Sequence, residues 1–91
     1  MAVLSIIGLG KIGASAGLAL APHADKITRL GHDREPTTAR KAQALGAVDK
    51  ILFNLPAAVE NADIVLLALP FDQILETVKV IAPCLREGAV V

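Results

Sequence analysis

The chain is a series of short apolar runs, each ending at a glycine, a proline or a polar cluster. Runs of this length and composition are typical of strands that are buried on both faces of a parallel sheet. The clearest run spans residues 63–69 (Asp-Ile-Val-Leu-Leu-Ala-Leu), because it is continuous and stops at Pro70. The predicted strands cover residues 2–7, 26–31, 48–53, 63–69 and 89–91.

The segments between these runs carry helical spacing. Apolar residues in the segment 71–82 recur at intervals of three and four, which is the pattern of an amphipathic helix. Pro36 suits the first turn of another helix, and Gly46 suits the position just after its end. The predicted helices cover residues 11–21, 37–45, 54–61 and 71–82.

Strands that alternate with helices through short loops predict right-handed crossovers and a parallel sheet. We therefore expect a single α/β domain over residues 1–91, of the doubly wound Rossmann type. It should have three layers (α/β/α) and the strand order 3-2-1-4-5. Because the sequence stops in an apolar run without a polar tail, we also expect it to be a truncated part of a longer protein.

The amino-acid composition indicates how the chain packs and which classes of partner it does not bind. Apolar residues make up 54% of the chain and neither Trp nor Tyr occurs, which suits thin helices packed closely on a sheet. Nine basic and nine acidic residues balance without a run of like charge, so we expect neither nucleic acid nor an anionic membrane surface as a partner. The longest apolar run is far shorter than the roughly 18 residues of a membrane-spanning helix.

The cysteine and histidine content favours a reducing compartment. Cys84 is the single cysteine, so it cannot form an internal disulfide, and it is interpreted as a structural or surface thiol. The sequence shows no His or Cys cluster with metal-ligand spacing. We expect a cytoplasmic protein without a bound metal.

The strongest chemical signal lies between the first strand and the first helix. Its sequence, which fits G-x-G-x-x-G, is Gly8-Leu9-Gly10-Lys11-Ile12-Gly13. In this position Gly8 permits a tight turn, Gly10 lets a pyrophosphate approach the backbone, and Gly13 lets the helix pack closely on the strand. The loop and the start of the helix, including Leu9, Lys11 and Ile12, are thus predicted to bind a dinucleotide through backbone N–H groups. The alternative is a tight turn that binds nothing.

Asp33 follows the second strand at the spacing expected for the carboxylate that bonds the adenosine ribose, about 20 residues after the last motif glycine. The alternative is an exposed loop acid. A carboxylate here repels the 2′-phosphate of NADP and so favours NAD. Arg34 opposes this preference, because it can pair with a 2′-phosphate or stack on adenine. NADP therefore remains the alternative cofactor.

Leu69 and Pro70 end the strongest strand, beside the point where the strand order reverses. Ligands of such sheets bind at this edge, so the turn is expected to border the ribose and nicotinamide. The alternative is an ordinary strand-to-helix turn. His32 is an exposed loop residue or an adenosine contact, and His23 lies away from the site. No residues form a recognisable catalytic set, so we predict none in this chain.

Several segments resemble the prephenate/arogenate dehydrogenases. They are residues 6–15 (IIGLGKIGAS), 31–34 (GHDR), 44–49 (ALGAVD), 62–70 (ADIVLLALP) and 88–91 (GAVV). The glycine pattern also occurs in the phosphogluconate and hydroxyisobutyrate dehydrogenases. Ser15 and the Gly-Ala-Val-Asp stretch at 46–49 favour the prephenate group.

The resemblance implies an activity and a larger architecture. Members of the family oxidatively decarboxylate prephenate or arogenate in tyrosine biosynthesis and pass hydride to NAD or NADP. Their substrate and hydride-transfer residues lie beyond the fifth strand and in a helical dimerisation domain, which this chain lacks. The implied full-length protein is a homodimer, and the chain alone is expected to hold the cofactor without turnover.

Two other interpretations remain at this point. One is a nucleotide-sensing regulatory domain without enzymatic activity, as in certain potassium channels, which share the glycine loop and the acid after the second strand. The other is the cofactor domain of a related hydroxyacid dehydrogenase.

Overall fold

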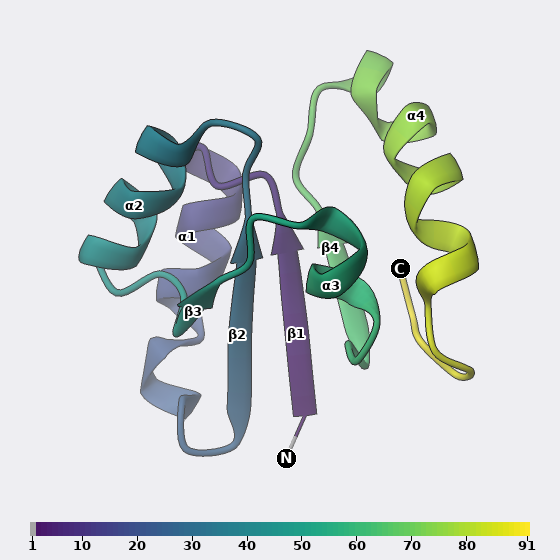
Figure 1. Cartoon of the computed structure of the whole chain (residues 1–91). Coiled ribbons are helices and arrows are strands. Elements are labelled where there is room, and N and C mark those ends of the chain that lie inside the picture. The colour runs from purple at the N-terminus through teal and green to yellow at the C-terminus, as the bar shows by residue number, and fades with distance from the viewer. Residues whose placement is uncertain (1) are drawn as a thin grey trace.

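A parallel sheet forms the centre of the molecule in the computed structural model, which describes residues 2–91. Its strands are β1 (Ala2–Ile7), β2 (Ile27–His32), β3 (Lys50–Ile51) and β4 (Ile64–Leu67), in the order β3-β2-β1-β4. Figure 1 shows β1 and β2 as the long central pair. The predicted parallel sheet and the order of its first four strands are confirmed.

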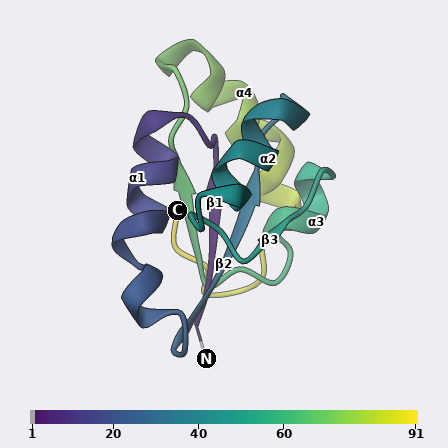
Figure 2. The same ribbon diagram turned by 90° about the vertical axis from the view of Figure 1, so that its left-hand side faces the viewer.

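Helices cover both faces of this sheet. They are α1 (Lys11–Ala19), α2 (Pro36–Ala44), α3 (Leu55–Val59) and α4 (Phe71–Ile81), with short 3-10 turns η1 (Ala21–His23) and η2 (Ala82–Cys84). One apolar cluster joins α2 to one face of β1 through Leu4 and Ile6, whereas Ile7 belongs to a second cluster with α3 and α4. The turned view in Figure 2 shows α1 on the opposite side of the sheet from α3 and α4. The predicted three layers are therefore present.

Two predicted strands are much shorter than expected. The third was predicted over 48–53, but only Lys50 and Ile51 pair with β2. Asn54 explains the early end, because its Oδ1 accepts a hydrogen bond from Ala57 N at 3.0 Å and so starts α3. The predicted fifth strand is a single parallel bridge between Val90 and Ile64, which still places residue 90 next to β4.

Some helix and strand ends also differ from the predictions. The first helix was predicted to reach residue 21 but ends at Ala19, since the chain tightens into η1 around Pro22. The strand predicted over 63–69 ends at Leu67, so Ala68 and Leu69 leave the sheet. No helix in the described part of the chain is long and apolar enough to cross a membrane.

The glycines of α1 bring the helix close to its neighbours. A Cβ on Gly13 would overlap the carbonyl oxygen of Gly8, and a Cβ on Gly17 would overlap that of Ala47. The packing role that the sequence predicts for Gly13 is therefore confirmed. The position of α1, which begins at the glycine loop, is set by backbone contact on two sides.

A buried arginine joins the other end of α1 to the sheet. Arg29 of β2 is 4% exposed, and its Nη1 donates to the carbonyl oxygens of Gly17 and Gly46 at 2.8 and 2.7 Å. Its Nη2 lies 3.0 Å from Oδ1 of Asp49. The hydrogen bonds from the Arg29 side chain and backbone hold the pKa of Asp49 below its ordinary value. The Gly-Ala-Val-Asp stretch at 46–49 thus has a structural function as the partner of Arg29.

Candidate functional site

The register of the sheet brings three strand ends together. Ile7 of β1 pairs with His32 of β2 on one side and with Leu67 of β4 on the other. The residues that follow these three therefore meet at one edge of the sheet, as expected for a doubly wound fold. A cleft of about 570 Å³ opens there, a volume typical of ligand sites.

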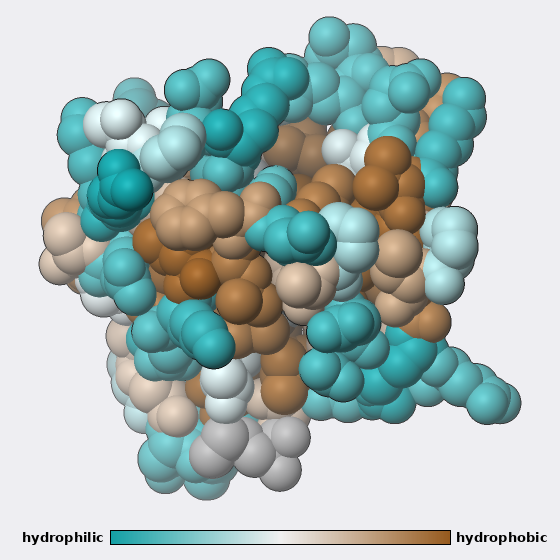
Figure 3. All heavy atoms as spheres, in the orientation of Figure 1, coloured by the Kyte–Doolittle hydropathy of each residue, from teal (hydrophilic) through white to brown (hydrophobic). Residues whose placement is uncertain are grey.

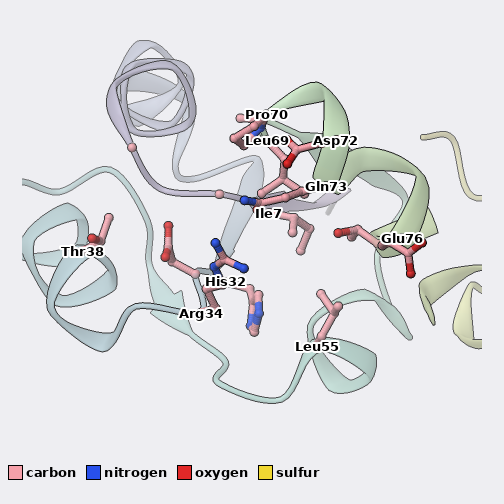
Figure 4. Close-up of a pocket in the computed structure, with 15 residues that line it drawn as sticks. Ile7, His32, Arg34, Thr38, Leu55, Leu69, Pro70, Asp72, Gln73 and Glu76 are labelled. Atoms are coloured by element: carbon pink, nitrogen blue, oxygen red, sulfur yellow. The ribbon is translucent and has the colours of Figure 1, made fainter. Parts of the chain in front are cut away.

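Six of the ten predicted site residues line this cleft. They are Gly8, Gly10, Asp33, Arg34, Leu69 and Pro70. In Figure 4 the strand ends and α4 surround the opening, with Leu69 and Pro70 on one side and Arg34 on another. Figure 3, in the orientation of Figure 1, shows apolar atoms recessed between hydrophilic ones near the upper ends of the strands. Residues from three separate segments of the sequence thus converge, as the motif analysis predicts.

The glycine loop forms a tight turn against the end of β4. Gly8 has φ +99°, a conformation that glycine adopts readily, and its N–H donates to the carbonyl of His32 at 2.8 Å. A Cβ at this position would overlap the carbonyl oxygen of Ala68. The tight turn predicted for Gly8 is confirmed, and only glycine fits between β1 and β4 here.

The start of α1 is open toward the cleft. Gly10 is the N-cap residue, has no side chain to accept a hydrogen bond, and would have open space around a Cβ. The first N–H groups of a helix have no acceptor within the helix, and its dipole favours negative charge there. An anionic group can therefore approach the backbone at Gly10.

Asp33 connects the end of β2 to the glycine loop. Its Oδ2 accepts a hydrogen bond from Leu9 N at 2.9 Å, and its Oδ1 accepts one from Glu35 N at 2.8 Å. Each carboxylate oxygen can accept a second hydrogen bond, so the group can still bind a hydroxyl in the cleft. The carboxylate thus orients the loop and remains available to a ligand.

The other four predicted residues lie outside the cleft. Leu9 is buried in the core with 3% exposed, and Gly13 is buried beneath the loop, so only their backbone is near the opening. Ile12 is 78% exposed, and Lys11 lines a smaller hollow of about 250 Å³ beside Gly10 and Lys41. The side chains of the loop therefore contribute less than its backbone.

The sequence analysis assigned no site role to most of the remaining lining residues. They are Ile7, His32, Thr38, Leu55, Ala68, Asp72, Gln73, Glu76 and Thr77. Of these, only His32 was considered, as a contact to adenosine. Polar residues at 72, 73, 76 and 77 share one side of α4, which is a signal in the sequence. Nothing in the sequence alone distinguishes a polar side that faces a cleft from one that faces solvent.

Charge is unevenly distributed around the cleft. Asp33, Asp72 and Glu76 are acidic, and Arg34 is the one Arg or Lys side chain among the lining residues. Both α4 carboxylates lie on the wall opposite β2. Within residues 2–91, no three His, Cys, Asp or Glu side chains are grouped to hold a metal ion. The end of the cleft that suits phosphate is therefore the start of α1.

A glycine loop at a helix start, an acid after the second strand and a cleft at the switch of strand order define a nucleotide-binding domain of the Rossmann type. The family model described as "Prephenate dehydrogenase, nucleotide-binding domain" matches residues 16–91. The chain belongs to this family, as its resemblance to the prephenate/arogenate dehydrogenases predicted.

Individual relatives agree with this assignment, and their matches also span the residues of the glycine loop, which the family model does not reach. The cyclohexadienyl dehydrogenase of Zymomonas mobilis is 31% identical over 88 residues, covering 97% of this chain and 30% of the relative. The prephenate dehydrogenase of Lactococcus lactis is 36% identical over 92 residues, covering all of this chain and 25% of the relative. The chain thus spans between a quarter and a third of the length of these proteins.

Solved structures show the same similarity. Prephenate dehydrogenase from A. aeolicus, in complex with hydroxyphenyl propionate and NAD+, superimposes with a TM-score of 0.87 and 31% identity. The match covers 99% of this chain and 32% of that one. Synechocystis arogenate dehydrogenase gives a TM-score of 0.83 and 29% identity over 97% of this chain and 31% of the other.

Proposed function

We propose that this chain binds NAD in the cleft, as the cofactor-binding part of a prephenate or arogenate dehydrogenase. One observation carries the proposal: Asp33 bonds to Leu9 N, so the acid and the glycine loop form a single wall of one cleft. The NAD+ named for the A. aeolicus relative supports the choice of cofactor.

Each part of the cleft has a role in this proposal. The N–H groups at the start of α1 bind the pyrophosphate, because Gly10 leaves the backbone accessible. Asp33 accepts hydrogen bonds from the ribose hydroxyls, and the turn at Leu69 and Pro70 borders the nicotinamide side. Bound NAD supplies a hydride acceptor, and the residues described here bind and orient it.

The charges support NAD over NADP. A 2′-phosphate would add negative charge beside Asp33, in a cleft that also contains Asp72 and Glu76. Arg34 opposes them alone; it is exposed, as Asp72 and Glu76 are, so solvent screens all three, whereas Asp33 is half-buried and its charge is screened less. We therefore propose NAD as the preferred cofactor.

The family supports a proposal for the activity of the whole protein. We propose that the full-length protein is a cytoplasmic homodimer that oxidatively decarboxylates prephenate or arogenate on the route to tyrosine. The substrate groups belong to a part of the protein outside this chain. We assign no catalytic residue to residues 1–91, so the chain alone should bind NAD without dehydrogenase activity.

A titration of NAD into the 91-residue chain and its Gly10→Ala variant tests the cofactor role of the loop. The added methyl lies where the pyrophosphate approaches, so affinity should fall about tenfold or more, or about 1.4 kcal/mol. The melting temperature without NAD should change little, because the space around a Cβ at residue 10 is open. Equal binding by both proteins would make the loop an ordinary turn and overturn the proposal.

A further inference from the structure

The side chain of His32 holds the segment that joins β3 to α3. Its Nδ1 lies 2.8 Å from the carbonyl oxygen of Leu52. A carbonyl oxygen only accepts hydrogen bonds, so Nδ1 carries the hydrogen and donates it. The N–H of Leu52 donates in turn to the carbonyl oxygen of Gly31 at 2.9 Å. Leu52 is therefore held through both of its backbone polar groups, one by the backbone of β2 and the other by a side chain of β2.

This segment leads directly to one side of the cleft. β3 ends at Ile51 and α3 begins at Leu55, so residues 52–54 join them. His32 and Leu55 both line the cleft, and Figure 4 shows them on the same side of the opening. The position of Leu55 relative to the sheet thus depends on the path of residues 52–54.

Apolar packing alone does not fix this path. Leu52 and Leu55 are half-buried and pack against the apolar cluster beneath α3 and α4. The hydrophobic effect is non-directional, so this packing draws the segment toward the sheet without setting its position along β2. The strand pairing adds little, because β3 pairs with β2 over two residues only. The hydrogen bond from His32 is directional, and it acts just where the pairing ends.

We infer that His32 is a positioning residue of the cleft, whose Nδ1–H fixes Leu52 and thereby places Leu55 against bound NAD. This inference rests on the proposed function and adds a residue that acts through another part of the chain. A wall that is ordered before the ligand arrives lowers the free-energy cost of binding. Loss of this hydrogen bond therefore weakens NAD binding through the disordered wall.

A direct contact between NAD and the second ring nitrogen is the competing explanation. Nε2 of His32 forms no hydrogen bond with any residue in the described range 2–91. Two amide side chains separate the explanations, since the N–H group of Asn lies near the place of Nδ1 and that of Gln near the place of Nε2. His32→Asn thus keeps the donor to Leu52, His32→Gln keeps a polar group at the place of Nε2, and His32→Leu removes both.

The test measures the dissociation constant of NAD for the 91-residue chain and these three variants. His23→Leu is the matched control, because His23 is exposed and does not line the cleft. The second measurement is hydrogen exchange of the Leu52 backbone N–H without NAD. Its reference is the N–H of Ala68, which donates to the carbonyl oxygen of Ile7 at 2.9 Å on the other side of β1. A general loss of stability speeds exchange at both positions, whereas a released segment speeds it at Leu52 alone.

We expect His32→Leu to weaken NAD binding about fivefold or more, and His32→Asn to restore it to within about twofold of the unchanged chain. Exchange at Leu52 relative to Ala68 should be faster in His32→Leu and normal in His32→Asn. The His23→Leu control should match the unchanged chain in both measurements.

Three results would overturn the inference: unchanged NAD binding in His32→Leu, equal weakening in His32→Asn and His32→Leu, or rescue by His32→Gln alone. Failure of the unchanged chain to bind NAD would overturn the proposed function and with it the cofactor part of the inference. The exchange at Leu52 decides separately whether His32 holds the segment.

Discussion

The two carboxylate oxygens of Asp33 accept hydrogen bonds from the backbone of Leu9 and Glu35, so this residue orders the loop that it shares with the proposed ligand. A serine in its place can accept from one N–H group but carries no charge. The structural and electrostatic functions of residue 33 can therefore be separated by comparing two ligands. A change in loop order affects NAD and NADP alike, whereas the lost charge affects the 2′-phosphate alone.

Asp33→Ser should raise the affinity for NADP relative to NAD by about tenfold, or about 1.4 kcal/mol, because the charge that repels the 2′-phosphate is removed and Arg34 remains. Both cofactors are titrated into the unchanged chain and the variant. Asp25→Ser, at an exposed loop position outside the cleft, serves as the control. A preference for NADP in the unchanged chain would show that the role given to Asp33 is wrong.

At the scale of the elements, the side chain of Arg29 fixes α1 and the end of α2 to the sheet. It donates to the carbonyl oxygens of Gly17, Gly46 and Ala47, and Asp49 accepts its remaining hydrogen bonds. Asp49 also accepts from the backbone N–H of Arg29 at 2.8 Å. Loss of this carboxylate would leave a buried guanidinium without its counter-ion.

Asp49→Asn should lower the free energy of unfolding at pH 7 by about 1–3 kcal/mol, since hydrogen bonds to a charged group are lost and Asp49 is partly exposed. The pKa of Asp49 is lowered in the folded state from an ordinary value of 3.8. Its contribution is thus complete above pH 3.8 and is lost as the pH falls through the folded-state pKa. The variant should show less loss of stability over this acid range.

Urea denaturation at several pH values measures this effect. Asp25→Asn is the control, because Asp25 is exposed and has no hydrogen bond or ion pair with the part of the chain that the structure describes. Equal stability of the two variants at pH 7 would contradict a supporting role for Asp49.

Local patterns predict the elements better than they predict the cleft. The glycine loop and Asp33 were predicted correctly as neighbours, because their positions depend on one strand-helix-strand unit. The α4 wall was missed although β4 was correctly predicted beside β1, because the sequence does not show whether the polar side of α4 faces the cleft or solvent. The third strand was predicted too long, because the apolar pattern of 48–53 does not reveal that Asn54 already caps the next helix.

At the scale of the whole molecule, cofactor binding should raise the free energy of unfolding. A ligand that binds the folded state alone, at 100 times its dissociation constant, adds about 2.7 kcal/mol to the free energy of unfolding. For a chain of this size that corresponds to a rise in melting temperature of roughly 10–20 °C. Thermal unfolding with and without NAD measures it, and Gly10→Ala at the same NAD concentration should show a smaller rise. No rise with NAD at millimolar concentration would contradict specific binding.

The central position of β1 also determines when the cleft can form during synthesis. β1 and β2 are made first, and the other edge of β1 has no partner until β4 leaves the ribosome. Val3 donates to Asp63, 60 positions later in the sequence, and Gly8 packs against Ala68. The cleft is completed later still, by α4. A nascent chain therefore gains no stability from the cofactor while its first strands assemble. Cofactor binding raises the free energy of unfolding only after all four strands have paired in order.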